Sequence, residues 1–386
     1  MRKEYLLTPG PTPLPPEVQA ALARPIIHHR TPAYRALFEE VLAGLQYLLQ
    51  TKATTMMFTS SGTGAMEAAV VNLLSPGDRA LIISAGKFGE RWTELCEAYD
   101  VEPLIVEVPY GHALDVDALR RRLKKDVKLR RKGGFKAVFA TLCETSTGVV
   151  HDIQALGAVV KELPAVLVVD AVSGLGADEF KPDQWGVDVV VAGSQKGLMI
   201  PPGLAFVSVS PKAWALVEHA KLPRYYFDFR RYRKALEEQD TPFTPAVSLV
   251  VALDEALKLL KKDGLDKVLA RHRMLAMATR TAVKGLGLEL FAAKPSNALT
   301  AVKVPLGIDG KRLVNYLRDQ LGVTIAGGQG EMAGKLFRIA HLGYMGPFDI
   351  ITAIAAVEMG LLELKYKVKL GNGVRAAEEI LSRLPA

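Results

Sequence analysis

The chain has 386 residues, of which 49% are hydrophobic and 23% charged, and its formal net charge is +8. This length predicts two or so domains, and the composition is ordinary for a globular protein with a sizeable core. Two cysteines, Cys96 and Cys143, exclude a disulfide framework and fit a reducing compartment, so we expect a cytoplasmic protein. No apolar run has the length of a membrane span, and the first residues lack the apolar segment of a secretory signal.

The chain begins with a proline-rich segment, LTPGPTPLPPEV, which disfavours both a helix interior and a central strand. We expect an extended arm over residues 1–20, with helices at 16–23 and 34–49. From residue 55 to residue 210, short apolar runs alternate with helical patterns. The expected strands are 56–59, 79–84, 102–106, 137–141, 166–170, 187–192 and 204–209, and the expected helices are 64–74, 89–99, 116–125 and 153–163. This alternation predicts an α/β fold with a mainly parallel, doubly wound sheet.

The pattern changes in the second half of the chain. Long helices are expected at 247–261 and 265–285, with a break near Asp263-Gly264. Two strands, 298–304 and 336–340, and two helices, 310–321 and 347–365, then indicate a smaller α+β unit. We therefore place a large domain at residues 21–262 and a small C-terminal domain at residues 263–386.

A cluster of basic residues occupies positions 120–132. Such a run could bind nucleic acid. It lacks interleaved aromatic residues and a recognition motif, so a solvated helix and turn is the favoured interpretation. We expect neither a nucleic acid nor a membrane as a partner.

Two apolar runs end in ionisable residues. Residues 166–169 lead into Asp170, and residues 187–191 lead through a small turn to Lys196. In a doubly wound sheet, ligands bind at the carboxyl ends of the strands. A lysine and an aspartate there predict pyridoxal phosphate (PLP), with its aldehyde on the lysine and its ring nitrogen kept protonated by the aspartate. The alternative interpretation of Lys196 is an ordinary surface lysine, and that of Asp170 is a cap of the helix that follows it.

The segment SSGTG at residues 60–64 follows one strand and opens a helix. Small residues at a helix N-terminus favour a phosphate, because free N–H groups and the helix dipole both attract an anion. The segment matches neither the Walker loop nor the G-x-G-x-x-G pattern. Alone it is equally well read as an ordinary capped helix start, and Asp170 and Lys196 make the phosphate site the stronger interpretation.

Other side chains could complete a site. Phe88 follows the strand 79–84 and could stack on a flat ring or pack in the core. Arg338 lies between apolar neighbours, where its planar guanidinium suits either a substrate carboxylate or an internal salt bridge. His28, His29 and Arg30 could line the mouth of the site or lie in a solvated loop. The histidines lack metal-ligand spacing, so we expect no metal.

In combination, these motifs resemble the class V aminotransferases of PLP fold type I, and most closely the alanine–glyoxylate / serine–pyruvate (serine–glyoxylate) group. The resemblance covers nearly the whole chain and rests on LTPGPTPLPPEV, SSGTGAMEAAVVNLLSPGD, CETSTGVV, VVDAVSGLGADEF, VVAGSQKGLMIPPG, YYFDF and FRIAHLGYMG. It implies transfer of an amino group from serine or alanine to glyoxylate or pyruvate, through a Schiff base on Lys196. It also implies a homodimer with shared active sites.

The resemblance further implies a role for each residue that matches a family motif. Phosphate binding falls to Ser61, Gly62 and Thr63, the last of which is often histidine in relatives. Phe88 would stack on the cofactor ring, where tryptophan is common, and Val172 would pack under it. Thr145 matches the residue that lies beside the ring hydroxyl of the cofactor in relatives, and Gln195 matches the residue directly before the lysine. Asp170 matches the residue that pairs with the ring nitrogen, and Arg338 matches the arginine that binds the substrate α-carboxylate. Thr244 lies in a segment that resembles the one reaching the cofactor phosphate of the partner subunit.

Other activities of the same superfamily remain as alternatives. The related cysteine desulfurases carry a cysteine in the loop that corresponds to residues 326–330, which has none here, and they tend to have histidine where this chain has Gln195. Both departures weigh against desulfuration. A phosphonate-amine transaminase, another class V enzyme such as a lyase, and a non-catalytic subunit of a redox complex are kept as alternatives. Retention of the lysine, the aspartate and Arg338 favours the enzyme.

Overall fold

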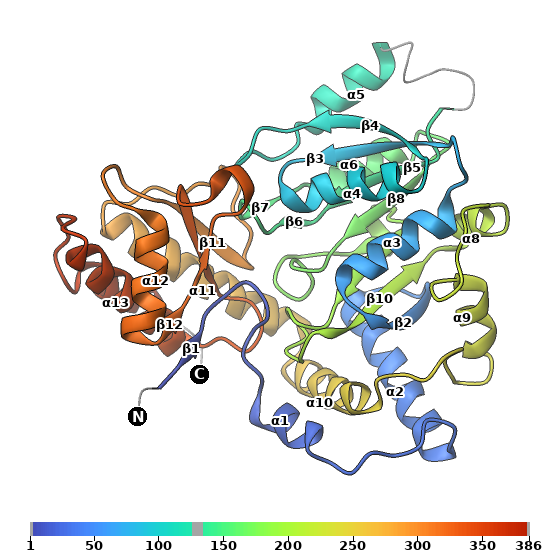
Figure 1. The fold of residues 1–386 in the computed structure, drawn as a ribbon, viewed down its shortest axis with the longest axis horizontal. Helices are drawn as coiled ribbons and strands as arrows, with labels where there is room; N and C mark the ends of the chain where they lie inside the picture. Colours follow the sequence, from blue (N-terminus) through green and yellow to red (C-terminus); the bar gives the residue numbers. More distant parts are fainter. Residues whose placement is uncertain (1–2, 126–133, 384–386) are drawn as a thin grey trace.

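The computed structural model describes residues 3–125 and 134–383 of the chain. A seven-stranded sheet forms the centre of the larger part, and a smaller part lies beside it, built mostly from the last third of the chain (Figure 1). In spatial order, the strands of the large sheet are β2 (Thr54–Ser60), β10 (Gly203–Val209), β9 (Val189–Gly193), β8 (Val166–Asp170), β5 (Ala137–Thr141), β3 (Arg79–Ser84) and β4 (Glu102–Glu107).

All strands of this sheet except β10 run in the same direction. β10 is antiparallel to both β2 and β9, and the other neighbouring pairs are parallel. The expected mainly parallel α/β sheet is therefore confirmed. Because parallel strands point the same way, the segments that follow β2, β3, β5, β8 and β9 all begin at one edge of the sheet.

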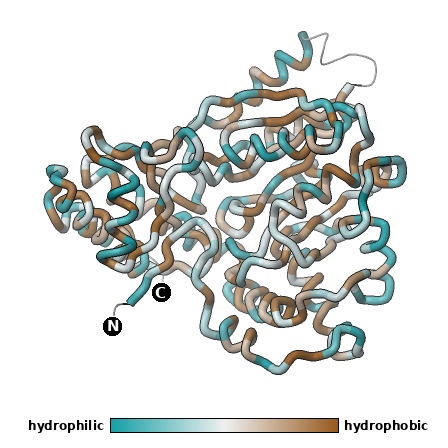
Figure 2. Tube along the Cα trace, in the orientation of Figure 1, coloured by the Kyte–Doolittle hydropathy of each residue, from teal (hydrophilic) through white to brown (hydrophobic). Residues whose placement is uncertain are grey.

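Helices cover both faces of the large sheet. One face packs against α2 (Pro32–Leu49), α5 (Val116–Lys125), α6 (Ile153–Val160) and α10 (Val247–Asp263), and the other packs against α3 (Gly62–Leu73), α4 (Lys87–Ala98), α8 (Pro211–Val217) and α9 (Phe229–Leu236). Along β5, Val138 and Ala140 join the first layer, while Ala137 and Phe139 join the second. Burial on both faces explains why the central strands β5, β8 and β9 are short, mostly apolar runs, and hydrophobic stretches run through the larger part in Figure 2.

The smaller part has its own core and its own sheet. Its sheet has the order β11 (Leu299–Lys303), β14 (Leu336–Ala340) and β13 (Ala326–Gly327), and its helices are α11 (Leu265–Gly285), α12 (Gly310–Leu321), α13 (Pro347–Glu363) and α14 (Asn372–Leu381). Gly264, with a φ of 82°, separates α10 from α11 at the predicted break. The domain boundary proposed at residue 262 stays a prediction.

The N-terminal arm is extended, as expected, but it also adds a strand to the smaller part. β1 (Tyr5–Leu6) pairs in parallel with β12 (Val323–Thr324), and Leu7 lies in the core of the smaller part. The chain then passes to α1 (Pro16–Leu22), which packs against α10 (Figure 1). The arm therefore bridges the two parts of the molecule.

Several short elements were not predicted. They include α7 (Pro182–Trp185), α8, α9, α14, the hairpin of β6 (Cys143–Glu144) and β7 (Val149–Val150), and the 3₁₀ turn η1 (Gly330–Met332). The helix expected at 64–74 begins at Gly62, so part of the SSGTG segment already lies in the first helical turn. Among the described residues, no helix combines the length and the apolar character that crossing a membrane requires.

The basic cluster at 120–132 lies partly on α5, where Arg121, Arg122, Lys124 and Lys125 are exposed. Leu119 and Leu123 form the buried face of the same helix. This arrangement is that of an amphipathic surface helix. The rest of the cluster, residues 126–132, lies outside the described residues.

Candidate active site at the carboxyl edge of the sheet

Lys196 lies in the turn after β9 and is only 8% exposed. Its ammonium group Nζ donates a hydrogen bond to the carbonyl oxygen of Pro9 in the N-terminal arm. Burial lowers the pKa of Lys196 to about 8, and the nearby positive charge of Arg338 acts in the same direction. A buried lysine with a lowered pKa supplies a neutral amine, which is the nucleophilic form.

Asp170 is the last residue of β8 and lies beside the strand that leads to Lys196. In the parallel pair of β8 and β9, Asp170 is opposite Val191. Its carboxylate accepts a hydrogen bond of 2.8 Å from the backbone N–H of Val172. Burial raises the pKa of Asp170 to about 6, although this hydrogen bond opposes the shift. The charge on this carboxylate therefore depends strongly on a partner.

Val172 and Gly62 form a tightly packed floor next to these two residues. A Cβ atom on Gly62 would lie 2.8 Å from Cγ2 of Val172, closer than side chains pack. On the other side, Gly193 leaves room for Gln195, whose Oε1 would lie 3.2 Å from a Cβ at that glycine. This Oε1 atom is buried and has no hydrogen-bond partner among the described residues. An unpaired buried acceptor in a native site calls for a ligand or water donor.

The SSGTG segment forms the N-terminus of α3. Ser61 is exposed and its side chain makes no capping hydrogen bond in the described structure, so the first turn keeps N–H groups for a ligand. Thr63 accepts a hydrogen bond of 3.1 Å from Nη1 of Arg91. The same guanidinium lies 5.0 Å from the ring centroid of Phe88, so Arg91 joins the α3 terminus to the predicted ring-stacking residue.

Arg338 reaches the same edge from β14 of the smaller part. It is 5% exposed, and its guanidinium donates to backbone carbonyls: Nη1 to Thr145 at 2.9 Å, and Nε and Nη2 to Gly327 at 3.0 and 2.7 Å. Burial lowers the pKa of Arg338 to about 10. No carboxylate in the described chain lies within ion-pair distance, so the internal salt bridge considered from the sequence is not formed. Two of its five N–H groups remain for a carboxylate ligand.

Thr145 lies between Arg338 and the sheet edge. Its carbonyl accepts from Arg338, and its hydroxyl donates to the hydroxyl oxygen of Ser173 at 2.6 Å. Thr145 and Ser173 are both buried. The structure therefore brings Thr145, Asp170, Val172, Lys196 and Arg338 to one region between the two parts of the molecule.

Sequence reasoning missed the part that the N-terminal arm takes in this region. Besides the contact of Pro9 with Lys196, Thr12 donates its N–H to the carbonyl of Gln195 at 3.2 Å and its hydroxyl to the carbonyl of Lys196 at 3.1 Å. A Cβ on Gly10 would lie 2.4 Å from the side chain of Lys196, and its φ of 131° also favours glycine. The signal available in the sequence was the density of Gly and Pro in TPGPTP, which marks a fixed backbone but not its target.

Sequence reasoning also missed Glu144, which is completely buried between Phe88 and Thr145. Its carboxylate accepts hydrogen bonds from the backbone N–H groups of Phe88, Gly89 and Ser146. Burial raises the pKa of Glu144, and these hydrogen bonds oppose the shift. Its position in CETSTGVV gave no indication that the carboxylate points inward.

Four residues singled out from the sequence lie apart from this region. Thr244 is exposed, in the segment before α10, and that segment meets the end of β2 through a hydrogen bond from the N–H of Ala246 to Thr59. His28 and His29 stack on each other with ring centroids 4.7 Å apart. Arg30 is exposed and lies 3.8 Å from the carboxylate of Asp240. Within the described single chain, none of these four contacts Lys196.

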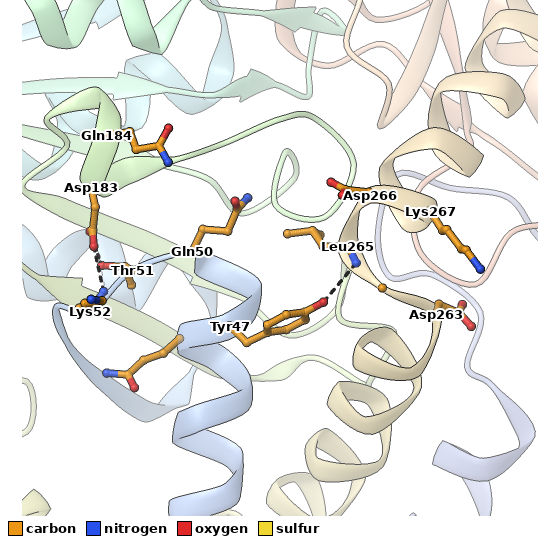
Figure 3. A pocket seen from close by; sticks show the side chains of 12 residues that line it. Tyr47, Gln50, Thr51, Lys52, Asp183, Gln184, Asp263, Leu265, Asp266 and Lys267 are labelled. Atoms are coloured by element: carbon orange, nitrogen blue, oxygen red, sulfur yellow. Dashed lines mark hydrogen bonds between the residues drawn. The ribbon is translucent and has the colours of Figure 1, made fainter.

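A separate cavity of about 790 Å³ lies between α2 and the junction of α10 with α11 (Figure 3). Tyr47, Asp183 and Leu265 line it, and the hydroxyl of Tyr47 accepts from the N–H of Leu265 at 3.2 Å. None of the predicted site residues lines this cavity. Its hydrogen bonds join neighbouring elements, as the 2.6 Å bond from the Thr51 hydroxyl to Asp183 does.

Comparisons with known proteins agree on one family. The family model Aminotransferase class-V matches residues 4–340. The soluble hydrogenase 42 kDa subunit of Anabaena cylindrica is 45% identical, over 98% of this chain and 99% of the relative. The L-aspartate–glyoxylate aminotransferase of Paracoccus denitrificans is 39% identical, over 97% and 95% of the two chains. The serine–glyoxylate aminotransferase of Arabidopsis thaliana is 36% identical, over 98% and 95%.

A solved structure extends the similarity to the whole fold. The ureidoglycine–glyoxylate aminotransferase of Bacillus subtilis superposes with a TM-score of 0.93 and 29% sequence identity, covering 99% of each chain. The similarity therefore includes both parts of the molecule and the edge at which they meet.

Proposed function

The chain belongs to the class V aminotransferase family, and we propose that it transfers the amino group of serine or alanine to glyoxylate or pyruvate. Amino acids and 2-oxo acids are the substrate classes of such enzymes. The observation that carries the finer proposal is Arg338, a buried guanidinium held by carbonyl oxygens with N–H groups left over. It supplies one carboxylate site, which suits a substrate with a single carboxylate.

Pyridoxal phosphate is the cofactor of this family, and the residues at the sheet edge fit it. The unpaired Oε1 of Gln195, the floor made by Gly62 and Val172, and the uncapped α3 terminus are each features that a flat, phosphorylated ring would use. Lys196 would hold its aldehyde, Asp170 its ring nitrogen, Thr145 its ring hydroxyl, Phe88 and Val172 its two faces, and Ser61, Gly62 and Thr63 its phosphate. When bound, the cofactor supplies an electron sink for the substrate Cα carbon.

Each protein group has a defined task in this proposal. Arg338 binds and orients the substrate carboxylate. The Nζ of Lys196 is a neutral amine above its lowered pKa, so it can take the proton from the substrate Cα atom. The same Nζ then donates this proton again to complete the transfer of the amino group. Asp170 holds a proton at the ring nitrogen of the cofactor. The arm residues Pro9 and Thr12 lie directly on the lysine and exclude water from it.

The cations near the site support a substrate with one carboxylate. Arg91 is engaged with Thr63 and Phe88, and Lys87 forms an ion pair with Glu90. Arg30, for which the sequence left open the mouth of the site or a solvated loop, pairs with Asp240. An acidic side chain would therefore enter the described site without a free cation and lose binding energy.

Steady-state kinetics with purified protein tests this proposal. Alanine and serine are expected to exceed aspartate and glutamate in kcat/KM with glyoxylate or pyruvate as acceptor. Arg338→Lys should raise KM about tenfold for every donor alike, because it removes the bidentate pair that all amino acids share. A kcat/KM for aspartate above those of alanine and serine would refute the substrate assignment. Aspartate belongs in the panel because a relative acts on it by name.

A second candidate function is a non-catalytic subunit of a redox complex. The name of the Anabaena relative, a soluble hydrogenase subunit, favours it. Against it stands the buried lysine with a lowered pKa beside a buried aspartate, which a structural subunit does not need. The same kinetic panel separates the two: cofactor binding without turnover of any donor would favour the subunit.

We also propose that the protein is a homodimer in which Thr244 contacts the cofactor phosphate of the partner subunit. Exposed aromatic side chains near Thr244 support this proposal. Tyr225 is 65% exposed, and the half-exposed Tyr226 stacks on Phe243 with ring centroids 5.0 Å apart. Aromatic residues of this kind are enriched at the centres of protein interfaces.

A further inference from the structure

Glu144 caps a helix that begins in a different segment of the chain. Helix α4 begins after Gly86, which has no side chain to accept its first N–H groups. The carboxylate of Glu144 accepts hydrogen bonds from the N–H of Gly89, 55 residues earlier in the sequence, at 2.9 Å and from that of Phe88 at 3.2 Å. By contrast, α6 and α12 are capped by the aspartate at their own N-cap, Asp152 or Asp309. Glu144 therefore ties the segment after β5 to the segment after β3.

The close packing around Glu144 shows how specific this cap is. A Cβ on Gly86 would lie 2.6 Å from Cδ of Glu144 and 2.4 Å from Oγ of Ser146, so the glycine is required for the approach. Ser146 donates both its N–H, at 3.1 Å, and its hydroxyl to the same carboxylate. A buried carboxylate is costly unless several donors compensate it, and here four do.

Glu144 also lies between two residues to which the proposed function gives a role at the cofactor, Phe88 and Thr145. Through its backbone N–H, Phe88 is fixed directly by the carboxylate. Thr145, the next residue in the chain, offers its carbonyl to Nη1 of Arg338 at 2.9 Å. The negative charge of Glu144 is near enough to Arg338 to favour the charged guanidinium, which burial disfavours. One buried carboxylate thus acts on both the cofactor side and the substrate side.

We propose that Glu144 is a positioning residue that holds Phe88 against the cofactor ring and the Thr145 carbonyl against Arg338. This inference rests on the proposed function, since it assumes that Phe88 faces the cofactor and Arg338 the substrate. A helix cap without this role would affect only stability. The two roles are distinguished by ligand binding. At an equal loss of stability, replacing a positioning residue weakens ligand binding, whereas replacing a simple helix cap does not.

Glu358 provides a matched control for the test. It is also buried, and its carboxylate accepts from three backbone N–H groups, those of Gly371, Gly373 and Val374, at 2.7, 2.7 and 3.2 Å. It belongs to α13 in the smaller part and contacts no proposed site residue. Glu144→Gln and Glu358→Gln each place an amide N–H₂ against backbone donors, so both should lower the Tm.

Titration of the apoprotein with pyridoxal phosphate, followed by kinetics with alanine and glyoxylate, measures the difference. Glu144→Gln should raise the Kd for pyridoxal phosphate and the KM for alanine about tenfold each, with a smaller change in kcat, because buried charged hydrogen bonds are lost at both ligands. Glu358→Gln should leave Kd and KM within about twofold of wild type while its Tm falls. Equal effects of the two variants on Kd and KM would overturn the proposal.

A milder variant covers the case in which Glu144→Gln does not fold. Ser146→Ala removes one donor to the carboxylate and should raise the Kd for pyridoxal phosphate about threefold. Wild-type Kd and KM in Ser146→Ala would then contradict the proposal. Failure of the proposed function gives a different result: the wild type itself would bind the cofactor without turning over any amino acid. In that case the comparison of Kd values between the variants would still test the role of Glu144 at Phe88.

Discussion

At the scale of single residues, burial sets the chemistry of the site. Lys196 and Asp170 lie at the ends of neighbouring parallel segments, and the same loss of water lowers the pKa of the amine and raises that of the carboxyl. Both shifts favour the neutral forms in the ligand-free protein. Binding of a group that is cationic at its ring nitrogen would restore the charge on Asp170, so this aspartate is poised to recognise such a group.

Replacing Asp170 by asparagine tests this role. Asp170→Asn should still bind pyridoxal phosphate through Lys196, but kcat should fall roughly 10²- to 10³-fold, because an amide cannot stabilise the proton on the ring nitrogen. Single-turnover kinetics and cofactor absorbance measure the two effects separately. Asp183→Asn is the control, since Asp183 also accepts a backbone N–H, that of Lys52 at 2.9 Å, far from the site. A kcat near wild type in Asp170→Asn would make Asp170 a structural residue.

The candidate site residues differ in how far the sequence could predict them. Lys196 and Asp170 were predictable because an ionisable residue at the end of an apolar run is unusual and its location in an α/β sheet is fixed. Arg338 was predictable because a charge between apolar neighbours needs a ligand or partner. Glu144 and Pro9 were not, because their roles come from contacts between segments that are distant in sequence. Local periodicity carries no information about such pairs.

At the scale of elements, the long helices and the buried strands followed from hydrophobic periodicity. α5, β3, β8, α11 and β14 agree with their expected bounds to the residue, because each has a clear apolar pattern and a clear end. The short helices α8 and α9 were missed because seven or eight residues give too little periodicity. β1 and β12, two residues each, exist only through pairing between the N-terminal arm and a segment of the smaller part that is distant in sequence. Short elements of this kind depend on tertiary contacts.

At the scale of the whole molecule, the proposed sharing of sites gives a prediction on assembly. Sedimentation at working concentration should show a dimer, because the aromatic surface around Tyr225 and Phe243 is otherwise exposed to water. Thr244→Ala should then raise the Kd for pyridoxal phosphate severalfold without dissociating the dimer, through loss of one phosphate hydrogen bond. An active monomer would remove the shared-site proposal and leave the roles of Lys196, Asp170 and Arg338 unaffected.

The proposed active site depends on one covalent link, between Lys196 and pyridoxal phosphate, and borohydride reduction with peptide mapping tests it directly. The purified protein should be yellow, and reduction should fix pyridoxal phosphate on the peptide that contains Lys196, because no other lysine combines such burial with a lowered pKa among the described residues. Lys196→Ala should take up no label under the same conditions. Label on a different lysine of the wild type, or no label at all, would contradict the assignment of this site.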